Sequence, residues 1–212
     1  MHPSDSTSAA LLASVALAAL AFVATTGSAQ VINNPTFDTD VSGWEPNAGR
    51  ALIEWSDLDA GARVDSGSAL VTNIAGEPGD GSGASQCVDG VLAGSVYWLE
   101  ALARFPAGQT ETGYAHLLVQ YFAQTSCVNQ LDLATSRELS SATQEVWRPL
   151  EKLFTTPALT QSLRLRLTVV KLEATGGLDA HFDEIALFPA VFVDGFEIGD
   201  SSAWTDTQPP PP

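Results

Sequence analysis

The feature of this sequence that most constrains its fold is the alternation of apolar and polar residues within short segments. In the range Val96–Phe105 every odd-numbered residue is apolar, and in Leu163–Val169 the odd-numbered apolar residues are separated by Arg164, Arg166 and Thr168. Successive side chains of an extended strand point to opposite faces, so this period of two predicts strands with one buried face. Such strands need a second sheet to cover the buried face.

Segments of this kind recur between Gln30 and Pro189, separated by Gly, Pro, Asn and Asp, and helical periodicity is nearly absent. The pattern predicts an all-β jelly-roll sandwich of two antiparallel sheets. We expect Gly76–Gly83 and Thr135–Thr143 to be loops. The predicted strands are Ala51–Trp55, Ser68–Asn73, Ser85–Val91, Val96–Phe105, Tyr114–Ala123, Val146–Phe154, Leu163–Leu172 and Ala180–Phe188, preceded by a short segment at Pro35–Phe37.

The two ends of the sequence differ from this middle part. The apolar run Leu11–Val23 is shorter than the roughly 20 residues that span a bilayer, and the small residues Gly27 and Ala29 follow it. This pattern predicts a signal peptide over 1–29 and a secreted protein, extracellular or periplasmic, although no Lys or Arg precedes the run. The alternative is a buried apolar helix. We expect the domain to cover 30–189 and a proline-rich tail to cover 190–212.

The charge of the chain excludes several classes of partner. The 25 Asp and Glu residues outnumber the 9 Lys and Arg residues, which gives a formal net charge of −16. Phosphate binding depends on basic residues that displace counterions, so we expect no nucleic-acid partner and no anionic membrane surface. Hydrophobic residues make up 45% of the chain, enough for a globular core.

Cys87 and Cys127 are the only cysteines of the chain. Export would place them in an oxidising compartment, where a single pairing is possible, so we expect a disulfide. The alternative is a pair of unbonded buried thiols. By chain entropy, a loop of about 40 residues closed in this way stabilises the fold by roughly 3–4 kcal/mol.

Six short motifs follow one another in order between Asn34 and Leu187. They are Asn34–Asp38, Gly43-Trp44, Ser66–Val71, Gly94–Leu99, Trp147–Leu150 with Phe154, and Phe182–Leu187. Together they resemble the motifs of secreted carbohydrate-binding modules of the family 4/9 type, within the galactose-binding-like jelly rolls. The resemblance implies a non-catalytic domain, monomeric, that binds a poly- or oligosaccharide. It is specific for the fold and much less so for the ligand.

The resemblance also implies a structural calcium ion where the first and last strands meet. The matching positions are Asp38, where the family more often has Glu, and Asp183. Hard cations such as calcium prefer carboxylate and carbonyl oxygens. The alternative is that Asp183 only ends a strand or pairs with a nearby cation. Trp44 and Trp147 fall on family positions that usually pack under the sheets, whereas Trp55 suits either a core or a loop-tip role.

Carbohydrate modules bind sugars on the outer face of a sheet or at loop tips, where aromatic rings and polar groups lie together. We expect Ser68–Asn73, Val96–Phe105, Tyr114–Ala123 and Leu163–Leu172 to share one sheet. The outward residues of that sheet, which would bind the glycan, are Trp98, Glu100, Arg104, Tyr114, His116, Gln120, Phe122, Arg164, Arg166 and Thr168. The alternative is a solvated face on which Glu100 pairs with Arg164 or Arg166.

Two other functions stay open from the sequence. The same fold can serve as a surface or structural interaction protein without affinity for sugar. A small jelly-roll glycoside hydrolase would need two carboxylates about 5–10 Å apart, for which Glu54 and Glu100 are the candidates. The sequence carries neither a Gly-x-Ser-x-Gly elbow nor zinc-binding spacing, so we do not expect an enzyme.

Overall fold

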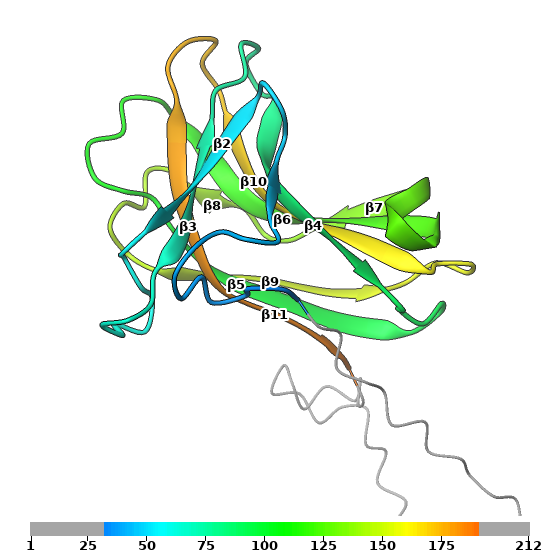
Figure 1. Cartoon of the computed structure of the whole chain (residues 1–212). Coiled ribbons are helices and arrows are strands. Elements are labelled where there is room, and N and C mark those ends of the chain that lie inside the picture. Colours follow the sequence, from blue (N-terminus) through cyan, green and yellow to red (C-terminus); the bar gives the residue numbers. More distant parts are fainter. Residues whose placement is uncertain (1–31, 191–212) are drawn as a thin grey trace, which may run out of the picture.

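In a computed structural model, residues 32–190 form two antiparallel sheets that pack face to face (Figure 1). These residues contain no α-helix, so none among them could cross a membrane as a helix. The predicted all-β sandwich is confirmed. The predicted signal peptide over 1–29 and positions 191–212 of the predicted tail lie outside the described residues.

The six-stranded sheet, here called sheet A, has the order β1-β4-β10-β6-β7, with β8 paired to β6. The five-stranded sheet, sheet B, has the order β2-β3-β11-β5-β9. The strands are β1 Glu45–Pro46, β2 Ala51–Ser56, β3 Ser68–Asn73, β4 Gly81–Asp89, β5 Val96–Arg104, β6 Gly113–Gln124, β7 Val128–Thr135, β8 Leu139–Ser140, β9 Arg148–Thr155, β10 Ser162–Lys171 and β11 Leu178–Pro189. A short 3-10 turn, η1 (Thr125–Cys127), joins β6 to β7.

The middle strand of each sheet comes from the end of the domain. The chain crosses between the sheets repeatedly, and β10 lies at the centre of sheet A while β11 lies at the centre of sheet B (Figure 1). β10 pairs with β4 and β6, and β11 pairs with β3 and β5. Both sheets are therefore completed only when residues 162–189 are in place.

The core lies between the sheets, as the alternation predicts. Tyr97, Leu99 and Phe105 of one predicted strand are buried, as are Leu163, Leu165 and Leu167 of another. Trp44 is buried too, as the resemblance implies. Truncation of a buried leucine of this kind to alanine typically costs about 2–5 kcal/mol of stability.

Several predicted element boundaries are wrong. Pro35–Phe37 forms a turn, and β4 begins at Gly81, inside the predicted loop Gly76–Gly83. Gly83 pairs so closely with β10 that a Cβ atom would lie 1.7 Å from the carbonyl oxygen of Leu167, so a glycine-rich strand fits where we expected a loop. β7 was missed because nearly all its side chains are exposed, which removes the apolar alternation.

The predicted grouping of four strands into one sheet is also wrong. Ser68–Asn73 and the Val96 segment belong to sheet B, whereas the Tyr114 and Leu163 segments belong to sheet A. The alternation of a strand says which of its sides is buried. It does not say which of the two sheets the strand joins, because both sheets present an apolar side to the same core.

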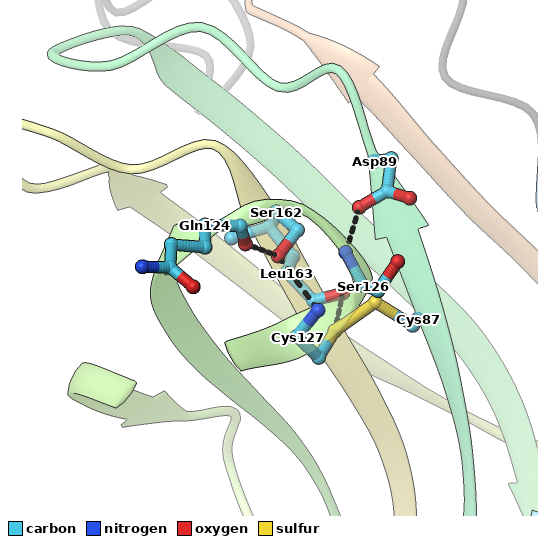
Figure 2. The surroundings of a disulfide bond; sticks show 7 residues. All are labelled: Cys87, Asp89, Gln124, Ser126, Cys127, Ser162 and Leu163. Atoms are coloured by element: carbon cyan, nitrogen blue, oxygen red, sulfur yellow. Dashed lines mark hydrogen bonds between the residues drawn. A yellow bond between two sulfur atoms is a disulfide. The ribbon is translucent and has the colours of Figure 1, made fainter. Parts of the chain in front are cut away.

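The predicted disulfide between Cys87 and Cys127 is confirmed, with the two Cα atoms 6.0 Å apart (Figure 2). The turn that carries Cys127 is held by hydrogen bonds on both sides. The Cys127 N–H donates to Ser162 Oγ at 3.1 Å, and the Ser126 N–H donates to Asp89 Oδ1 at 2.7 Å. The crosslink thus joins the end of β4 to η1, beside β10.

Candidate functional site

The outward side of β6 and β10 carries a dense group of polar and aromatic side chains, here called the A face. In the strand register, Arg164 lies opposite Gln120, and Thr168 lies opposite His116. Side chains directly opposite each other in a sheet are close neighbours. The A face consists of Tyr114, His116, Gln120, Phe122, Arg164, Arg166 and Thr168. It therefore brings together seven of the ten outward residues that are predicted from the sequence to bind the glycan.

The other three predicted residues lie on the opposite side of the molecule. Trp98, Glu100 and Arg104 point outward from β5 in sheet B, on a surface here called the B face. The sandwich separates this surface from the A face. Glu100 therefore cannot pair with Arg164 or Arg166, and that alternative is wrong.

Tyr114 and His116 form a stacked pair on the A face. Their ring centroids are 5.8 Å apart with an interplanar angle of 29°. Burial, and secondly the charge of Arg166, lower the pKa of His116, so the imidazole is neutral at pH 7. A neutral, half-buried pair of rings offers the flat apolar surface on which the C–H face of a sugar ring packs.

Three buried polar atoms of the A face have no hydrogen-bond partner among the described residues. They are His116 Nδ1, Gln120 Oε1 and Thr168 Oγ1. Gln120 is held in place from its other end, since its Nε2 donates to Gln130 Oε1 at 2.9 Å. A buried polar atom without a partner costs about 1–3 kcal/mol, so the hydrogen bonding of this surface is incomplete.

Two arginines complete the A face. The guanidinium of Arg164 lies over the Phe122 ring, 5.0 Å from its centroid. Arg166 follows on the same side of β10, and within residues 32–190 neither arginine forms an ion pair. Burial, then the charges of Arg164 and Arg50, lower the pKa of Arg166.

The B face has a different character. Trp98, Pro149 and Leu153 help to line a hollow of about 200 Å³, together with Arg137 and Glu151. The indole N–H of Trp98 already donates to Glu100 Oε2 at 3.0 Å. Arg104 Nη2 lies 3.9 Å from Glu145 Oε1, and the Nε of the same guanidinium is buried and unpaired. The B face therefore offers an aromatic hollow, but its Trp98 N–H is already bonded to Glu100.

The structure contradicts the prediction for Trp147 and decides between the two roles left open for Trp55. Trp147 does not pack under a sheet. It is half-buried on the outside of sheet B, with its ring centroid 6.3 Å from that of His181. Trp55 lies at the end of β2 and is 41% exposed, and its indole N–H donates to the Phe37 carbonyl oxygen at 2.7 Å.

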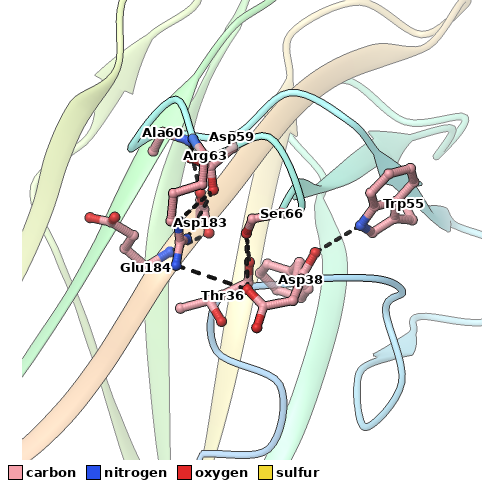
Figure 3. Close-up of polar contacts among 10 residues, drawn as sticks. Thr36, Asp38, Trp55, Asp59, Ala60, Arg63, Ser66, Asp183 and Glu184 are labelled. Carbon is pink, nitrogen blue, oxygen red and sulfur yellow. Dashed lines mark hydrogen bonds and ion pairs between the residues drawn. The ribbon is translucent and has the colours of Figure 1, made fainter.

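The predicted calcium positions lie in one cluster, where the two ends of the domain meet (Figure 3). The Ile185 N–H donates to the Pro35 carbonyl oxygen at 2.9 Å. Asp183 is fully buried and accepts backbone N–H groups from Ala60 and Glu184 at 2.9 and 2.7 Å. Burial raises the pKa of Asp183 to about 6, and the nearby charges of Asp59 and Glu184 add to this effect.

A guanidinium group already occupies this cluster. Arg63 donates to Asp59 Oδ2 from Nε and Nη2 at 3.1 and 2.9 Å, and its Nη1 lies 3.9 Å from Asp38 Oδ1 (Figure 3). No group of three or more His, Cys, Asp or Glu side chains in 32–190 is arranged to hold a metal. As arranged, the residues suit a guanidinium rather than calcium, and the predicted ion stays a prediction.

The carboxylate pair considered for a hydrolase is not formed. Glu54 is on β2 and Glu100 on β5, with β3 and β11 between them. Three strand spacings separate their backbones by about 14 Å, which exceeds the about 5–10 Å that glycoside hydrolysis needs. The carboxylate that lies opposite Glu100 in the register is Glu151.

Neither a protein-family model nor a curated protein matches the sequence. Solved structures do share the fold. The C-terminal family 22 carbohydrate-binding module of Clostridium thermocellum Xyn10B aligns with 75% of this chain and 92% of its own length, with a TM-score of 0.50 and 22% identity. A xylan-binding domain of family 22 aligns with 79% of this chain and 99% of its own length, with a TM-score of 0.52 and 20% identity.

An arabinose-bound α-L-arabinofuranosidase gives a TM-score of 0.57 at 17% identity over 77% of this chain. The chain spans only 27% of that enzyme, and 21% and 27% of a bacteriophage tailspike protein and a xylanase that also match. At these identities the likeness establishes a shared jelly-roll fold and nothing about ligand.

Proposed function

We propose that this protein is a secreted, non-catalytic domain that binds a polysaccharide on its A face. The observation that carries the proposal is the stacked Tyr114–His116 pair beside three buried polar atoms without partners. Glycan recognition needs both elements on one surface. Fold neighbours that are themselves described as carbohydrate-binding modules support the proposal.

In this proposal one sugar ring packs its C–H face against Tyr114, and polar side chains further along β6 and β10 bond with hydroxyl groups of this and the following sugar residues. Gln120 Oε1 can only accept a hydrogen bond, and Thr168 Oγ1 can donate or accept. A hydroxyl group of the sugar can do both, so it matches either partner. Because β6 and β10 are paired strands within a sheet, their backbone is fixed, and only side-chain rotation is needed to bring these buried atoms to the ligand.

The test is titration calorimetry with soluble xylan on the wild type and two variants. Tyr114→Ala removes the stacking ring, and we expect a loss of affinity of roughly two- to tenfold, since stacking contributes roughly 0.5–1.5 kcal/mol. Trp98→Ala removes the aromatic ring of the B face and should leave affinity unchanged. Loss of binding in Trp98→Ala alone would move the site to the B face, and wild type that binds no glycan would contradict the proposal.

The proposed export has support from the disulfide, because such bonds form and persist in oxidising compartments. Expression with the full N-terminus tests it. Mass spectrometry of the exported protein should show a chain that begins at Gln30. A protein retained in the cell with residue 1 intact would contradict this part of the proposal.

Calcium at Asp38 and Asp183 would require Arg63 to move away from the carboxylates. Melting temperatures measured in calcium and in EDTA decide between the two cations. A higher melting temperature in calcium supports the ion. Equal values contradict it and leave Arg63 as the cation of this cluster.

The interaction-protein alternative draws on the B face. Leu153 and Phe188 are 40% and 42% exposed, and in the register both lie opposite Trp98. Apolar side chains grouped on one surface are typical of protein contacts. Binding that Trp98→Ala abolishes and that no glycan competes for would favour this alternative.

A further inference from the structure

The A face contains two guanidinium groups that lack a counter-ion. Arg164 and Arg166 are separated by one residue and point to the same side of β10, so their backbones are about 7 Å apart. Neither side chain donates a hydrogen bond to any residue in 32–190, and neither has a carboxylate within ion-pair distance there. The other charged groups that act on Arg166, Arg164 and Arg50, are also positive.

This arrangement is unusual for a chain with 25 acidic and 9 basic residues. Both arginines are half-buried, and partly desolvated charges are normally paired. In the strand register, Glu45 lies opposite Ser85, which lies opposite Arg166, so Glu45 is on this side of sheet A but two strands away. Its exposed carboxylate forms no ion pair with either arginine. The missing negative charge is therefore one that a ligand can supply.

The guanidinium of Arg164 packs against an aromatic ring of the neighbouring strand. The Phe122 ring supports its guanidinium on one side, and Cys87, the disulfide-bonded residue of β4, lies opposite Arg164 in the register. A guanidinium donates two parallel hydrogen bonds to a carboxylate in a fixed geometry. Arg166 lies one pair of residues further along β10, next to Thr168 and His116.

From this geometry we infer that the A face binds a polysaccharide carrying isolated carboxylate groups, and that Arg164 and Arg166 hold one such group on a sugar residue further along the strands than the one stacked on Tyr114. The inference rests on the proposed glycan-binding function and adds the chemical class of the ligand. A densely charged polyanion does not fit, because the net charge of −16 repels it. A single carboxylate feels mainly the two arginines, because screening limits the reach of other charges to about 8 Å at physiological salt.

The experiment compares three forms of one polysaccharide by titration calorimetry at 0.15 M salt. The first is xylan with glucuronic acid branches, the second is the same xylan with its carboxyl groups reduced to alcohols, and the third is densely sulfated xylan. We expect the wild type to bind the carboxylated form at least tenfold more tightly than the reduced form. Sulfated xylan should show no such gain.

Two variants identify the residues. Arg166→Gln should remove the preference for the carboxylated form, so that its affinities for the carboxylated and the reduced form agree within about twofold. Arg148→Gln makes the same charge change at an exposed position of β9 in sheet B, and it should keep the preference. Circular dichroism and melting temperature show that both variants are folded.

The outcomes separate this inference from the function it rests on. Equal affinity of the wild type for the carboxylated and reduced forms overturns the inference and leaves glycan binding in place. Tighter binding of the sulfated form overturns the assignment to isolated carboxylates. No binding of any of the three forms overturns both the inference and the proposed function.

Discussion

The two outer surfaces of this sandwich are built by the same kind of strand, yet they differ in the charges they carry and in how many of their polar atoms are hydrogen-bonded. The A face presents Arg164 and Arg166 and three buried polar atoms without partners. The B face presents carboxylates instead, and two of them accept hydrogen bonds, Glu100 from Trp98 and Asp179 from Thr72. These carboxylates are Glu54, Glu100, Glu151 and Asp179.

The comparison shows what net charge can and cannot predict. A net charge of −16 excludes binding modes that need an overall positive surface. It does not predict the sign of a single face, because screening makes each surface depend on the charges within about a nanometre. Under the proposed function, incomplete hydrogen bonding marks the A face as the surface that binds the ligand.

The largest change in stability is expected on removal of Arg63, the cation that pairs with the acidic groups near β11. Arg63→Met leaves the buried Asp59 without its partner, and we expect a loss of about 2 kcal/mol of stability, or roughly 4–8 °C in melting temperature. This is below the range for a fully buried pair because the Arg63 side chain is 45% exposed. Thermal denaturation in EDTA measures the effect.

Glycan affinity on the A face should not change in Arg63→Met, because the two regions share no residue. Arg148→Met serves as the control for loss of one positive charge. An Arg63→Met protein as stable as the wild type would show that the cluster does not need this cation.

A smaller change in stability is expected when threonine is replaced by valine on each face, and the sign should differ between the two faces. Thr168→Val on the A face replaces an unpaired hydroxyl by a methyl group of the same shape, so we expect a gain of about 0.5–1 kcal/mol in stability. The same change at Thr72 in sheet B removes a hydrogen bond of 2.6 Å to Asp179, and we expect a loss of about 1 kcal/mol. Urea denaturation of both variants measures the difference.

Glycan titration completes this comparison. Thr168→Val should weaken binding several-fold, and Thr72→Val should leave it unchanged. Destabilisation by both substitutions would mean that the Thr168 hydroxyl contributes to the fold, and the contrast between the two faces would then be lost.

The smallest net effect is expected in the dependence of stability on pH. Burial, and secondly Arg104, lower the pKa of His181 on the outside of sheet B to about 4, although Asp179 acts in the other direction. A lowered pKa in the native state gives stability that is fully present above pH 6.5 and is lost as the pH falls towards 4. Asp183 opposes this, because its raised pKa gives stability that is lost as the pH rises from 3.8 to about 6.

His181→Gln should therefore show less loss of stability between pH 6.5 and 4 than the wild type, as measured by urea midpoints in EDTA. His116 on the A face also has a lowered pKa and keeps part of the dependence in this variant. A pH dependence identical to that of the wild type would contradict the pKa of His181.

The sequence predicts the layers of this fold well, because alternation records burial directly. Leu163 and Tyr97 are buried as the period of two requires. The disulfide follows from having only Cys87 and Cys127 in the chain. The assignment of strands to sheets could not be predicted, because an inward side chain packs in the same core whichever sheet carries it.

The same limit explains why the candidate site was predicted only in part. The residues that face outward were identified correctly, but Trp98 and Tyr114 were placed on one surface although they lie on opposite surfaces. The unpaired state of Thr168 Oγ1 depends on its three-dimensional surroundings, so no sequence pattern reports it. Arg63 is only four residues from Asp59, but its approach to Asp38 appears only in the folded structure, so no sequence pattern pointed to this cation.

The bond between Cys87 and Cys127 also has a mechanical consequence. The 40-residue separation it closes contains β5 of one sheet and β6 of the other. Tension applied to the two ends of the protein passes through the sulfur atoms and does not reach this loop. About 140 Å of chain would therefore stay unextended under load until a reductant opens the bond, and force spectroscopy with and without reductant would reveal that difference in length.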